Sequence, residues 1–246
     1  MPDLALAYSG GVDSSFLAWF MVHHARCRPL CLLVSTPFQR ARDLTSARLG
    51  AVALGIEIRE LIFDPFSIPA LRHNPKDRCY LCKKRIMSLI QAEAAACGRH
   101  TVADGSQADD LIGYRPGRQA LAELGVISPL AEAGLAKDDI RTLSRLAGLS
   151  GWNRPAESCL ATRVPYGHPL TRALLSRIDA AEQFLLDLGL PVVRLRVHGD
   201  LARIETDPLS FATLLDPARR RQIVDRLHEL DFSHVALDLV GYRSGS

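Results

Sequence analysis

Short apolar runs that alternate with helix-like patterns dominate the first hundred residues of the chain. The apolar runs are Leu4–Tyr8, Leu30–Ser35, Ile56–Phe63 and His100–Ala103. The helical patterns between them are Ser15–Ala25, Asp43–Gly55 and Lys83–Cys97. Continuous apolar strands separated by helices are typical of a doubly wound, mostly parallel sheet, in which ligands bind at the carboxyl ends of the strands. The pattern therefore predicts an α/β domain over residues 1–150 with a site at that edge.

The rest of the chain predicts a smaller α+β domain. Residues 151–169 are rich in proline and glycine but also contain Trp152, Cys159 and Tyr166, which favours an ordered functional loop over a disordered linker. Beyond this loop the pattern predicts helices over residues 171–188 and 217–230, a hairpin of strands 192–198 and 201–206, and a last strand at 235–240. We therefore expect an active-site loop at 151–169 and a small α+β substrate-binding domain at 170–246.

Composition narrows the class of protein further. The chain has 246 residues, of which 48% are hydrophobic and 23% charged, as in ordinary globular proteins. The net charge of +3 is too small to indicate nucleic acid as the main partner. No apolar run approaches the roughly 20 residues that cross a bilayer, and the first residues do not resemble a secretory signal. We expect a cytoplasmic homo-oligomer that binds a small molecule and neither nucleic acid nor membrane.

A glycine-rich turn, Ser9–Ser15, separates the first strand from the first helix. Its two adjacent glycines allow a tight turn whose N–H groups, together with the positive end of the helix dipole, favour a bound anion. No lysine follows the glycines, so the turn is not the GxxxxGKS/T loop of phosphate-transferring proteins. The alternative is an ordinary strand–turn–helix junction capped by Asp13 or a serine.

A second polar segment follows the fourth strand and should open onto the same crevice. It contains Asp104, Asp109 and Asp110. Carboxylate oxygens of this kind can hold Mg²⁺ alongside phosphates, whereas helix capping explains at least one of the three.

The six cysteines fall into two groups. Cys27, Cys31 and Cys97 lie in apolar or helical contexts and are predicted to be buried thiols. Cys79 and Cys82 form a CxxC pair before a helix, which suits zinc, a redox pair, a cluster or simple packing. With Cys159 as a third ligand, a 4Fe–4S site with one open iron becomes possible.

Cys159 itself lies in a loop framed by proline and glycine, near Arg154 and Arg163. Such electropositive surroundings favour a thiolate, which can attack a carboxylate activated as its adenylate. The alternative is a small apolar residue in a loop.

Arginines mark the C-terminal strands. Arg194 and Arg196 share one face of their strand, Arg203 lies on the paired strand, and Arg243 follows the last one. Guanidinium groups suit phosphate or carboxylate ligands, and a solvated polar face is the alternative. No carboxylate lies between Arg194 and Arg196, which favours an anionic ligand.

Taken together these motifs resemble one protein family. SGGVDSS resembles the PP-loop of the ATP pyrophosphatases, which hold the pyrophosphate of ATP while an acceptor takes the AMP. The likeness extends over nearly the whole chain through RCYLCK, DGSQADDLIGYRPG, SPLAEAGLAKDDIR, ESCLATRVPYG, VRLRVHGDLARIE and LDLVGYRSGS. CLATRVPYG and the closing GYRSGS resemble one subgroup, the LarE family of ATP-dependent sulfur transferases of nickel-pincer nucleotide biosynthesis.

The resemblance implies that ATP adenylates a carboxylate of a pyridinium-3,5-biscarboxylate mononucleotide and that sulfur then displaces AMP. It implies Cys159 and Glu182 as catalytic residues and Asp13 as a ligand of Mg²⁺. The residues expected to bind ATP are Ser9, Gly10, Gly11, Asp13, Ser14, Ser15, Ser35 and Asp104. Those expected to bind the substrate are Arg163, Arg194, Arg196 and Arg243.

Two sulfur sources remain open. In one branch of the family the cysteine gives up its own sulfur and becomes dehydroalanine. In the other, three cysteines, here matching Cys79, Cys82 and Cys159, hold a 4Fe–4S cluster whose extra sulfide is transferred.

Three other functions compete with this one. A tRNA thiolase would require an RNA-binding module and a strongly basic face, and the net charge is only +3. An amide-forming ligase that uses ammonia would have no use for Cys159. A non-catalytic adenine-nucleotide sensor would bind ATP without releasing pyrophosphate.

Overall fold

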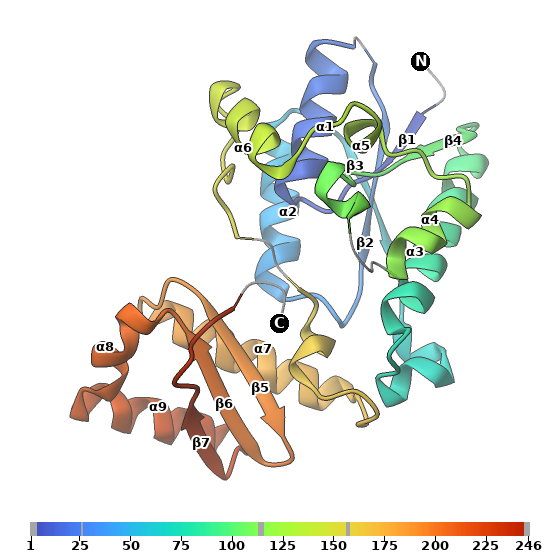
Figure 1. Cartoon of the computed structure of the whole chain (residues 1–246). Helices are drawn as coiled ribbons and strands as arrows, with labels where there is room; N and C mark the ends of the chain where they lie inside the picture. The colour runs from blue at the N-terminus through green and yellow to red at the C-terminus, as the bar shows by residue number, and fades with distance from the viewer. Residues whose placement is uncertain (1–3, 26, 113–115, 156–157, 244–246) are drawn as a thin grey trace. The chain divides into compact units, whose positions relative to one another are not determined.

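The computed structural model describes residues 4–25, 27–112, 116–155 and 158–243 (Figure 1). Its contacts divide the chain into an N-terminal unit, residues 1–67 and 76–157, and a C-terminal unit, residues 68–75 and 158–246. The short segment 68–75 thus belongs to the C-terminal unit although it comes from the first half of the chain. The predicted domain boundaries at 150 and 170 stay a prediction. Parts of three motifs, at 113–115, 156–157 and 244–246, lie outside the described residues.

A four-stranded parallel sheet forms the centre of the N-terminal unit. Its strands are β1 (Leu4–Ala7), β2 (Leu30–Ser35), β3 (Ile58–Ile62) and β4 (Thr101–Ala103). They are arranged in the order β3-β2-β1-β4, and all neighbours run parallel. The predicted α/β class with a parallel sheet is therefore confirmed. Because the strand order reverses between β1 and β4, the loops that leave these two strands diverge and open a crevice at their carboxyl ends.

Helices flank this sheet (Figure 1). They are α1 (Val12–His23), α2 (Ala41–Ala53), α3 (Arg78–Ala96), α4 (Pro116–Glu123), α5 (Pro129–Glu132) and α6 (Lys137–Leu146). Alternate residues of a strand face opposite sides of its sheet. Leu6 and Leu33 accordingly pack in one buried cluster with Phe16 of α1 and Ala47 of α2. Leu32, of opposite parity, faces the side where Met87 of α3 lies.

Several local predictions need correction. Helix α3 begins at Arg78 and not at Lys83, so Cys79 and Cys82 lie within its first two turns. The stretch 78–83 contains neither glycine nor proline to delay the helix. Helices α4, α5 and α6 were not predicted: α4 and α5 are short, whereas α6 has an amphipathic pattern that the sequence analysis missed.

The cysteine predictions are confirmed for two residues and wrong for a third. Cys27 and Cys31 are buried, and burial raises the pKa of the Cys31 thiol to about 12. Cys97 is only partly buried, and its sulfur lies 2.9 Å from a guanidinium nitrogen of Arg59. It ends a helix at the surface and does not belong to the core.

The C-terminal unit contains a small mixed sheet covered by helices. Its elements are α7 (Arg172–Asp187), β5 (Val193–His198), β6 (Leu201–Thr206), α8 (Phe211–Leu215), α9 (Pro217–Glu229) and β7 (His234–Leu237). β5 and β6 form the predicted antiparallel hairpin, and β7 pairs in parallel with β6. Ile178 of α7 and Leu195 of β5 are both fully buried. The side chain of Thr171 caps α7 by accepting a hydrogen bond from Leu174 N.

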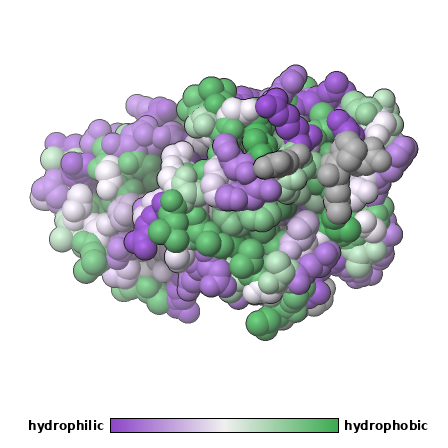
Figure 2. Space-filling view, turned by 90° about the horizontal axis from the view of Figure 1, so that it is seen from above, coloured by the Kyte–Doolittle hydropathy of each residue, from purple (hydrophilic) through white to green (hydrophobic). Residues whose placement is uncertain are grey.

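The described surface mixes hydrophilic and hydrophobic residues, as Figure 2 shows for one face. Among the described residues, no helix combines the length and apolar character that crossing a membrane requires.

Candidate functional site

A cavity of about 310 Å³ lies at the carboxyl ends of β1 and β4, and we refer to it as the Asp104 cavity. Its apolar floor includes Leu32 and Val34 of β2 and Met87 of α3. Its polar lining comprises Ser9, Gly11, Asp13, Ser14, Gln39, Lys83, Asp104, Ser106 and Asp110. The structure thus brings together five of the residues predicted to bind ATP: Ser9, Gly11, Asp13, Ser14 and Asp104. The prediction that the glycine turn and Asp104 share one crevice is confirmed.

The glycine turn is already ordered by its own hydrogen bonds. The hydroxyl oxygens of Ser9 and Ser14 lie 3.1 Å apart, and Ser14 Oγ accepts a hydrogen bond from Ser9 N at 3.2 Å. Gly10 has a φ of 73°, and a Cβ on it would lie 2.3 Å from Ala47 Cβ. A side chain at this position would therefore push α2 away from the turn.

A second glycine closes the cavity on the side of β4. A Cβ on Gly105 would lie 2.9 Å from the backbone nitrogen of Ser14. The loop after β4 therefore lies directly against the first turn of α1, and only glycine allows this approach.

Asp104 is fixed in place by surrounding donors. It is 2% exposed and accepts hydrogen bonds from Ser106 Oγ at 2.7 Å and Ser128 Oγ at 2.8 Å. Lys83 Nζ lies 3.4 Å from its carboxylate and remains 34% exposed. The rest of the described lining is acidic or neutral, so Lys83 is its cation. Sequence reasoning did not assign Lys83 to the site. Its position immediately after the CxxC pair, in a helix that faces the sheet edge, was the available signal.

Asp13 forms an ion pair with Lys137, the first residue of α6. Both carboxylate oxygens accept hydrogen bonds from Lys137 Nζ, at 2.7 and 2.8 Å. Burial raises the pKa of the Asp13 carboxyl, and the ion pair with Lys137 only partly opposes this shift. The residue predicted to bind Mg²⁺ therefore has a protein cation, Lys137, as its partner.

The neighbouring carboxylates have capping roles as well. Asp110 accepts a hydrogen bond from Gln107 N at 3.1 Å, and Asp109 accepts one from Lys137 N at 3.0 Å. The prediction that capping explains at least one of the three aspartates is confirmed.

Three residues predicted to bind ATP lie away from the Asp104 cavity. Gly10 and Ser15 line a different cavity, next to Trp152. Ser35 ends β2 and is not among the residues that line either cavity; its side chain is a hydrogen-bond partner of Glu60.

The second group of predicted site residues lies in the C-terminal unit, around Cys159. Cys159 is half-buried and precedes a 3-10 helix, Leu160–Arg163. Its carbonyl oxygen accepts hydrogen bonds from Thr162 N at 3.0 Å and Thr162 Oγ1 at 2.8 Å. Arg196 of β5 donates to the carbonyl oxygen of Thr162 at 2.7 Å. The backbone next to Cys159 is thus hydrogen bonded to strand β5 of the C-terminal sheet.

A buried ion pair supports this loop. Arg163 donates to both carboxylate oxygens of Glu182, at 2.7 and 3.0 Å, and both side chains are 0% exposed. Arg163 also donates to Ser158 O at 3.0 Å, while Glu182 accepts from Leu195 N at 2.9 Å. The pair therefore connects the Cys159 loop, α7 and β5. A bidentate pair with further hydrogen bonds is the arrangement that lets two charges remain buried.

Asn74 is a residue of this site that sequence reasoning missed. It is fully buried in the left-handed conformation, with a φ of 48°. Its side-chain amide nitrogen donates to the carbonyl oxygens of Val164 at 2.7 Å and Pro165 at 3.0 Å. Its backbone carbonyl oxygen accepts a hydrogen bond from Gly167 N. This network explains why segment 68–75 belongs to the C-terminal unit. No local pattern around Asn74 indicates it, because its partners lie some ninety residues away.

The predicted substrate arginines have partners that the local sequence did not reveal. Arg194 is 4% exposed, and its guanidinium lies 4.6 Å from the ring centre of Tyr242. Burial lowers the pKa of Arg194, and the positive charges of Arg163 and Arg196 add to this effect. Arg196 pairs with Glu205 on β6 at 3.1 Å. The absence of a carboxylate between Arg194 and Arg196 was therefore a weak signal, since the partner comes from the next strand.

Arg243, the last of the predicted substrate arginines, contacts Arg194 through its backbone. Its side chain is exposed, and its carbonyl oxygen accepts a hydrogen bond from Arg194 at 3.2 Å. Arg194 therefore connects β5 to the end of the described chain.

The three cysteines of the predicted cluster differ in exposure. Cys79 is exposed and Cys82 half-buried, and both belong to the N-terminal unit; Cys159 belongs to the C-terminal unit. Cys79 and Cys82 are three residues apart on α3, which places them on neighbouring positions of the helix surface. Within either unit, no three His, Cys, Asp or Glu side chains of the described residues form a metal-binding group.

Known proteins resemble the chain over nearly its whole length, although no family model matches it. An uncharacterized protein of Synechocystis is 37% identical over 240 residues, which span 98% of this chain and 90% of that protein. The pyridinium-3,5-bisthiocarboxylic acid mononucleotide synthase of Lactiplantibacillus plantarum is 33% identical over 243 residues, 98% of this chain and 87% of the synthase. An uncharacterized protein of Methanocaldococcus jannaschii is 27% identical over 241 residues, 98% of this chain and 91% of that protein.

The match to the synthase is long enough to decide the family. It includes both units of the structure and leaves only a few residues of this chain unmatched. The chain therefore belongs to the LarE family, together with the pyridinium-3,5-bisthiocarboxylic acid mononucleotide synthase.

Proposed function

We propose that this protein is an ATP-dependent sulfurtransferase that converts a carboxylate of pyridinium-3,5-biscarboxylate mononucleotide into a thiocarboxylate. The observation that carries the proposal is the Asp104 cavity, in which an ordered glycine turn at a helix N-terminus faces Lys83 and buried Asp104. Membership of the LarE family supports the substrate, because the product named for the relative is the bisthiocarboxylic acid.

The first step in this proposal is adenylation. A substrate carboxylate oxygen attacks the α-phosphorus of ATP, the bond between the α-phosphorus and the bridging oxygen breaks, and pyrophosphate leaves. The N–H groups of the glycine turn, the dipole of α1 and the ammonium of Lys83 would stabilise the charge of the leaving pyrophosphate. Asp13 and Asp110, which line the same cavity, would hold Mg²⁺ beside the phosphates.

The second step transfers sulfur. The thiolate of Cys159 attacks the acyl carbon and AMP leaves with the electron pair of the broken carbon–oxygen bond. Loss of a proton from the Cα atom of Cys159 and cleavage of its Cβ–Sγ bond would then give the thiocarboxylate and dehydroalanine. Arg163 and Arg196, which bind the backbone of the Cys159 loop, would hold the sulfur in a fixed position.

The alternative sulfur source uses the CxxC pair. Cys79, Cys82 and Cys159 would hold a 4Fe–4S cluster, because cysteine thiolates are the donors that iron–sulfur clusters require. When bound, the cluster supplies a transferable sulfide and Cys159 keeps its own sulfur. Iron and acid-labile sulfide analysis after anaerobic purification would distinguish the two sources: about four irons for each chain support the cluster, and their absence supports the sacrificial cysteine.

Incubation of the protein with ATP, Mg²⁺ and the biscarboxylate mononucleotide tests the function directly. The proposal requires AMP, pyrophosphate and a thiocarboxylate product identified by its mass. ADP and phosphate as products would contradict it. ATP binding without hydrolysis would favour a nucleotide sensor, and a shift of tRNA in a gel would favour a tRNA thiolase.

Asp13→Ala should abolish the formation of AMP and pyrophosphate. The change removes a carboxylate from the Asp104 cavity and leaves Lys137 without its ion-pair partner. Product release is measured with labelled ATP, and a thermal melt verifies that the variant is folded. Asp138→Ala is the matched control, because the Asp138 side chain is 94% exposed. Full activity in Asp13→Ala would contradict the proposal that Asp13 belongs to the nucleotide site.

Replacing Arg194 and Arg196 with alanine should weaken use of the mononucleotide far more than binding of ATP. Each hydrogen bond to a charged group contributes roughly 1.5–3 kcal/mol, or about tenfold or more in affinity for each arginine. Calorimetry with each ligand measures the two effects separately. Lysine at both positions should restore part of the affinity, and Arg220→Ala with Arg221→Ala, on the exposed face of α9, should change neither. Equal losses for both ligands would assign these arginines to the fold alone.

A further inference from the structure

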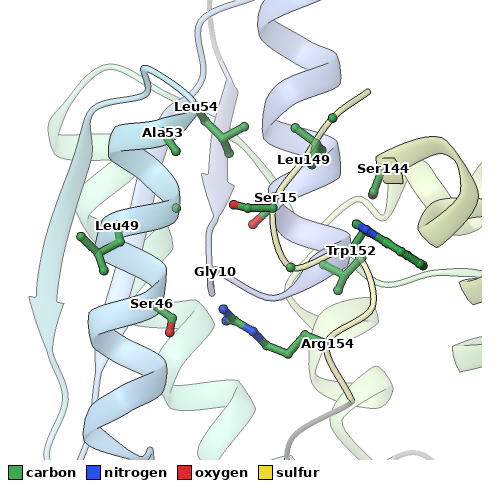
Figure 3. Close-up of a pocket in the computed structure, with 15 residues that line it drawn as sticks. Gly10, Ser15, Ser46, Leu49, Ala53, Leu54, Ser144, Leu149, Trp152 and Arg154 are labelled. Atoms are coloured by element: carbon green, nitrogen blue, oxygen red, sulfur yellow. The ribbon is translucent and has the colours of Figure 1, made fainter. Parts of the chain in front are cut away.

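The N-terminal unit contains a second cavity, of about 470 Å³, which we refer to as the Trp152 cavity. Its walls come from the first turn of α1, from α2, and from the segment 148–154 together with Ser144 of α6. Figure 3 shows these three walls facing a common space. A volume of this size accommodates a small organic molecule.

Ser144 indicates that this space is made for a polar ligand. The residue is 1% exposed and lines the cavity, and its hydroxyl oxygen has no hydrogen-bond partner among the described residues. A buried hydroxyl without a partner destabilises a protein, so such groups are rare unless something else satisfies them. A ligand atom that hydrogen bonds to Ser144 Oγ would remove this cost.

Arg154 supplies a positive charge to the same cavity. Its side chain is half-buried and makes no ion pair or side-chain hydrogen bond within the described part of the chain. Figure 3 shows its guanidinium extending toward Gly10 and Ser46. None of the described residues that line the cavity has a carboxylate. A guanidinium in such surroundings is suited to a carboxylate or phosphate ligand.

The other residues that line the Trp152 cavity indicate the shape and polarity of the ligand's body. Leu49, Leu54 and Leu149 provide apolar walls, and the ring of Trp152 lies beside Ser144 (Figure 3). Aromatic and aliphatic walls of this kind favour a flat apolar body. We propose that the Trp152 cavity is a binding site for a small aromatic anion, with a carboxylate or phosphate group on Arg154 and an aromatic body against Trp152.

This site is separate from the Asp104 cavity and does not rest on the proposed function. Residues of one turn alternate between the two spaces: Ser9, Gly11 and Asp13 line the Asp104 cavity, whereas Gly10 and Val12 line the Trp152 cavity. A ligand in the Trp152 cavity therefore contacts the glycine turn from the opposite side.

Tryptophan fluorescence tests the proposal without any activity assay. The chain has two tryptophans, so Trp19→Phe leaves Trp152 as the only tryptophan, which is excited selectively at wavelengths where the five tyrosines do not absorb. Benzoate and phenyl phosphate, which carry the two anionic groups, should each change the Trp152 emission saturably, and uncharged benzyl alcohol should not. Arg154→Gln should weaken both by about tenfold or more, the factor expected for one lost charged hydrogen bond. Arg85→Gln, an exposed arginine on α3, is the matched control and should have no effect.

Ser144→Ala provides a second, independent measurement. It should weaken benzoate binding several-fold and, because it removes an unsatisfied buried hydroxyl, raise the melting temperature of the unliganded protein. Unsaturable quenching, unchanged affinity in Arg154→Gln, or displacement of benzoate by competing ATP would each overturn the proposal. Failure of the sulfurtransferase assay would leave these binding results unaffected, so the two proposals fail separately.

Discussion

Replacing Cys159 with serine should abolish sulfur transfer while adenylation of the substrate, with its release of pyrophosphate, continues. Serine keeps the shape of the side chain, but its hydroxyl is scarcely ionised at neutral pH and is a much weaker nucleophile than a thiolate. Five of the residues predicted to bind ATP line the Asp104 cavity of the N-terminal unit, and Cys159 belongs to the C-terminal unit. The two steps should therefore be separable by mutation. Thiocarboxylate formation and pyrophosphate release, measured on the same sample, check this expectation.

The CxxC variants then distinguish the sulfur sources. With a cluster, Cys79→Ala or Cys82→Ala should remove the iron chromophore and the transfer together, because three thiolates hold the cluster. With a sacrificial cysteine, both variants should complete one turnover, after which Cys159 has lost the mass of hydrogen sulfide. Cys97→Ala is the control, since this thiol is also partly exposed but lies beside Arg59. Continued transfer in Cys159→Ser would refute both mechanisms.

Glu182→Gln should lower the free energy of unfolding by about 3–5 kcal/mol, the usual cost of removing one partner from a buried ion pair. Glutamine has nearly the same shape, but it leaves the Arg163 guanidinium charged and buried, since neither side chain is exposed. Urea denaturation of the wild type and the variant measures the difference. The matched control is Glu229→Gln, which breaks an exposed pair with Arg226 and should cost about 0–1 kcal/mol.

A double variant separates the energetic cost of the unpaired buried charge from the cost of altered packing. Arg163→Met combined with Glu182→Gln removes the isolated charge and should recover part of the stability lost in Glu182→Gln. A loss below about 1 kcal/mol in Glu182→Gln would mean that solvent reaches the pair and that the ion pair does not hold the loop.

The ion pair between Arg163 and Glu182 also indicates how Glu182 could act in the reaction. The resemblance implied a catalytic carboxylate, and in the structure both of its oxygens bind Arg163 while one also accepts from Leu195 N. We propose that Glu182 positions the Cys159 loop through Arg163. A positioning role predicts that Glu182→Gln reduces sulfur transfer and leaves adenylation intact; a purely structural role would reduce both in proportion to the folded fraction.

The order of strands and helices could be predicted from the sequence because it depends on local patterns. β2 and β6 occur at the predicted residues, and the hairpin at His198–Leu201 follows from a glycine turn between two alternating strands. The glycine turn after β1 was likewise visible, since the need for glycine at position 10 is a property of the backbone at that residue. The shared crevice followed from topology, because parallel strands end at one edge of their sheet.

Less regular elements gave no such signal. Helix α3 was predicted to start five residues too late. Helices α4 and α5 were missed because short helices depend on tertiary contacts more than on their own periodicity. Helix α6 was also missed, although its pattern is amphipathic. Cys97 was assigned to the core from its apolar neighbours, but the helix ends at that residue and turns its sulfur toward Arg59.

By itself, the sequence determined the fold class, the position of the glycine turn and the family, all of which depend on residues close together in the chain or on whole motifs. Only the tertiary structure decided which charges meet. Lys137 binds Asp13 from 124 residues away, and Asn74 binds the carbonyl of Val164 from 90 residues away. Such partners are chosen by packing, because burial of a charge or an amide is tolerated only where the fold brings a complementary group within hydrogen-bond distance.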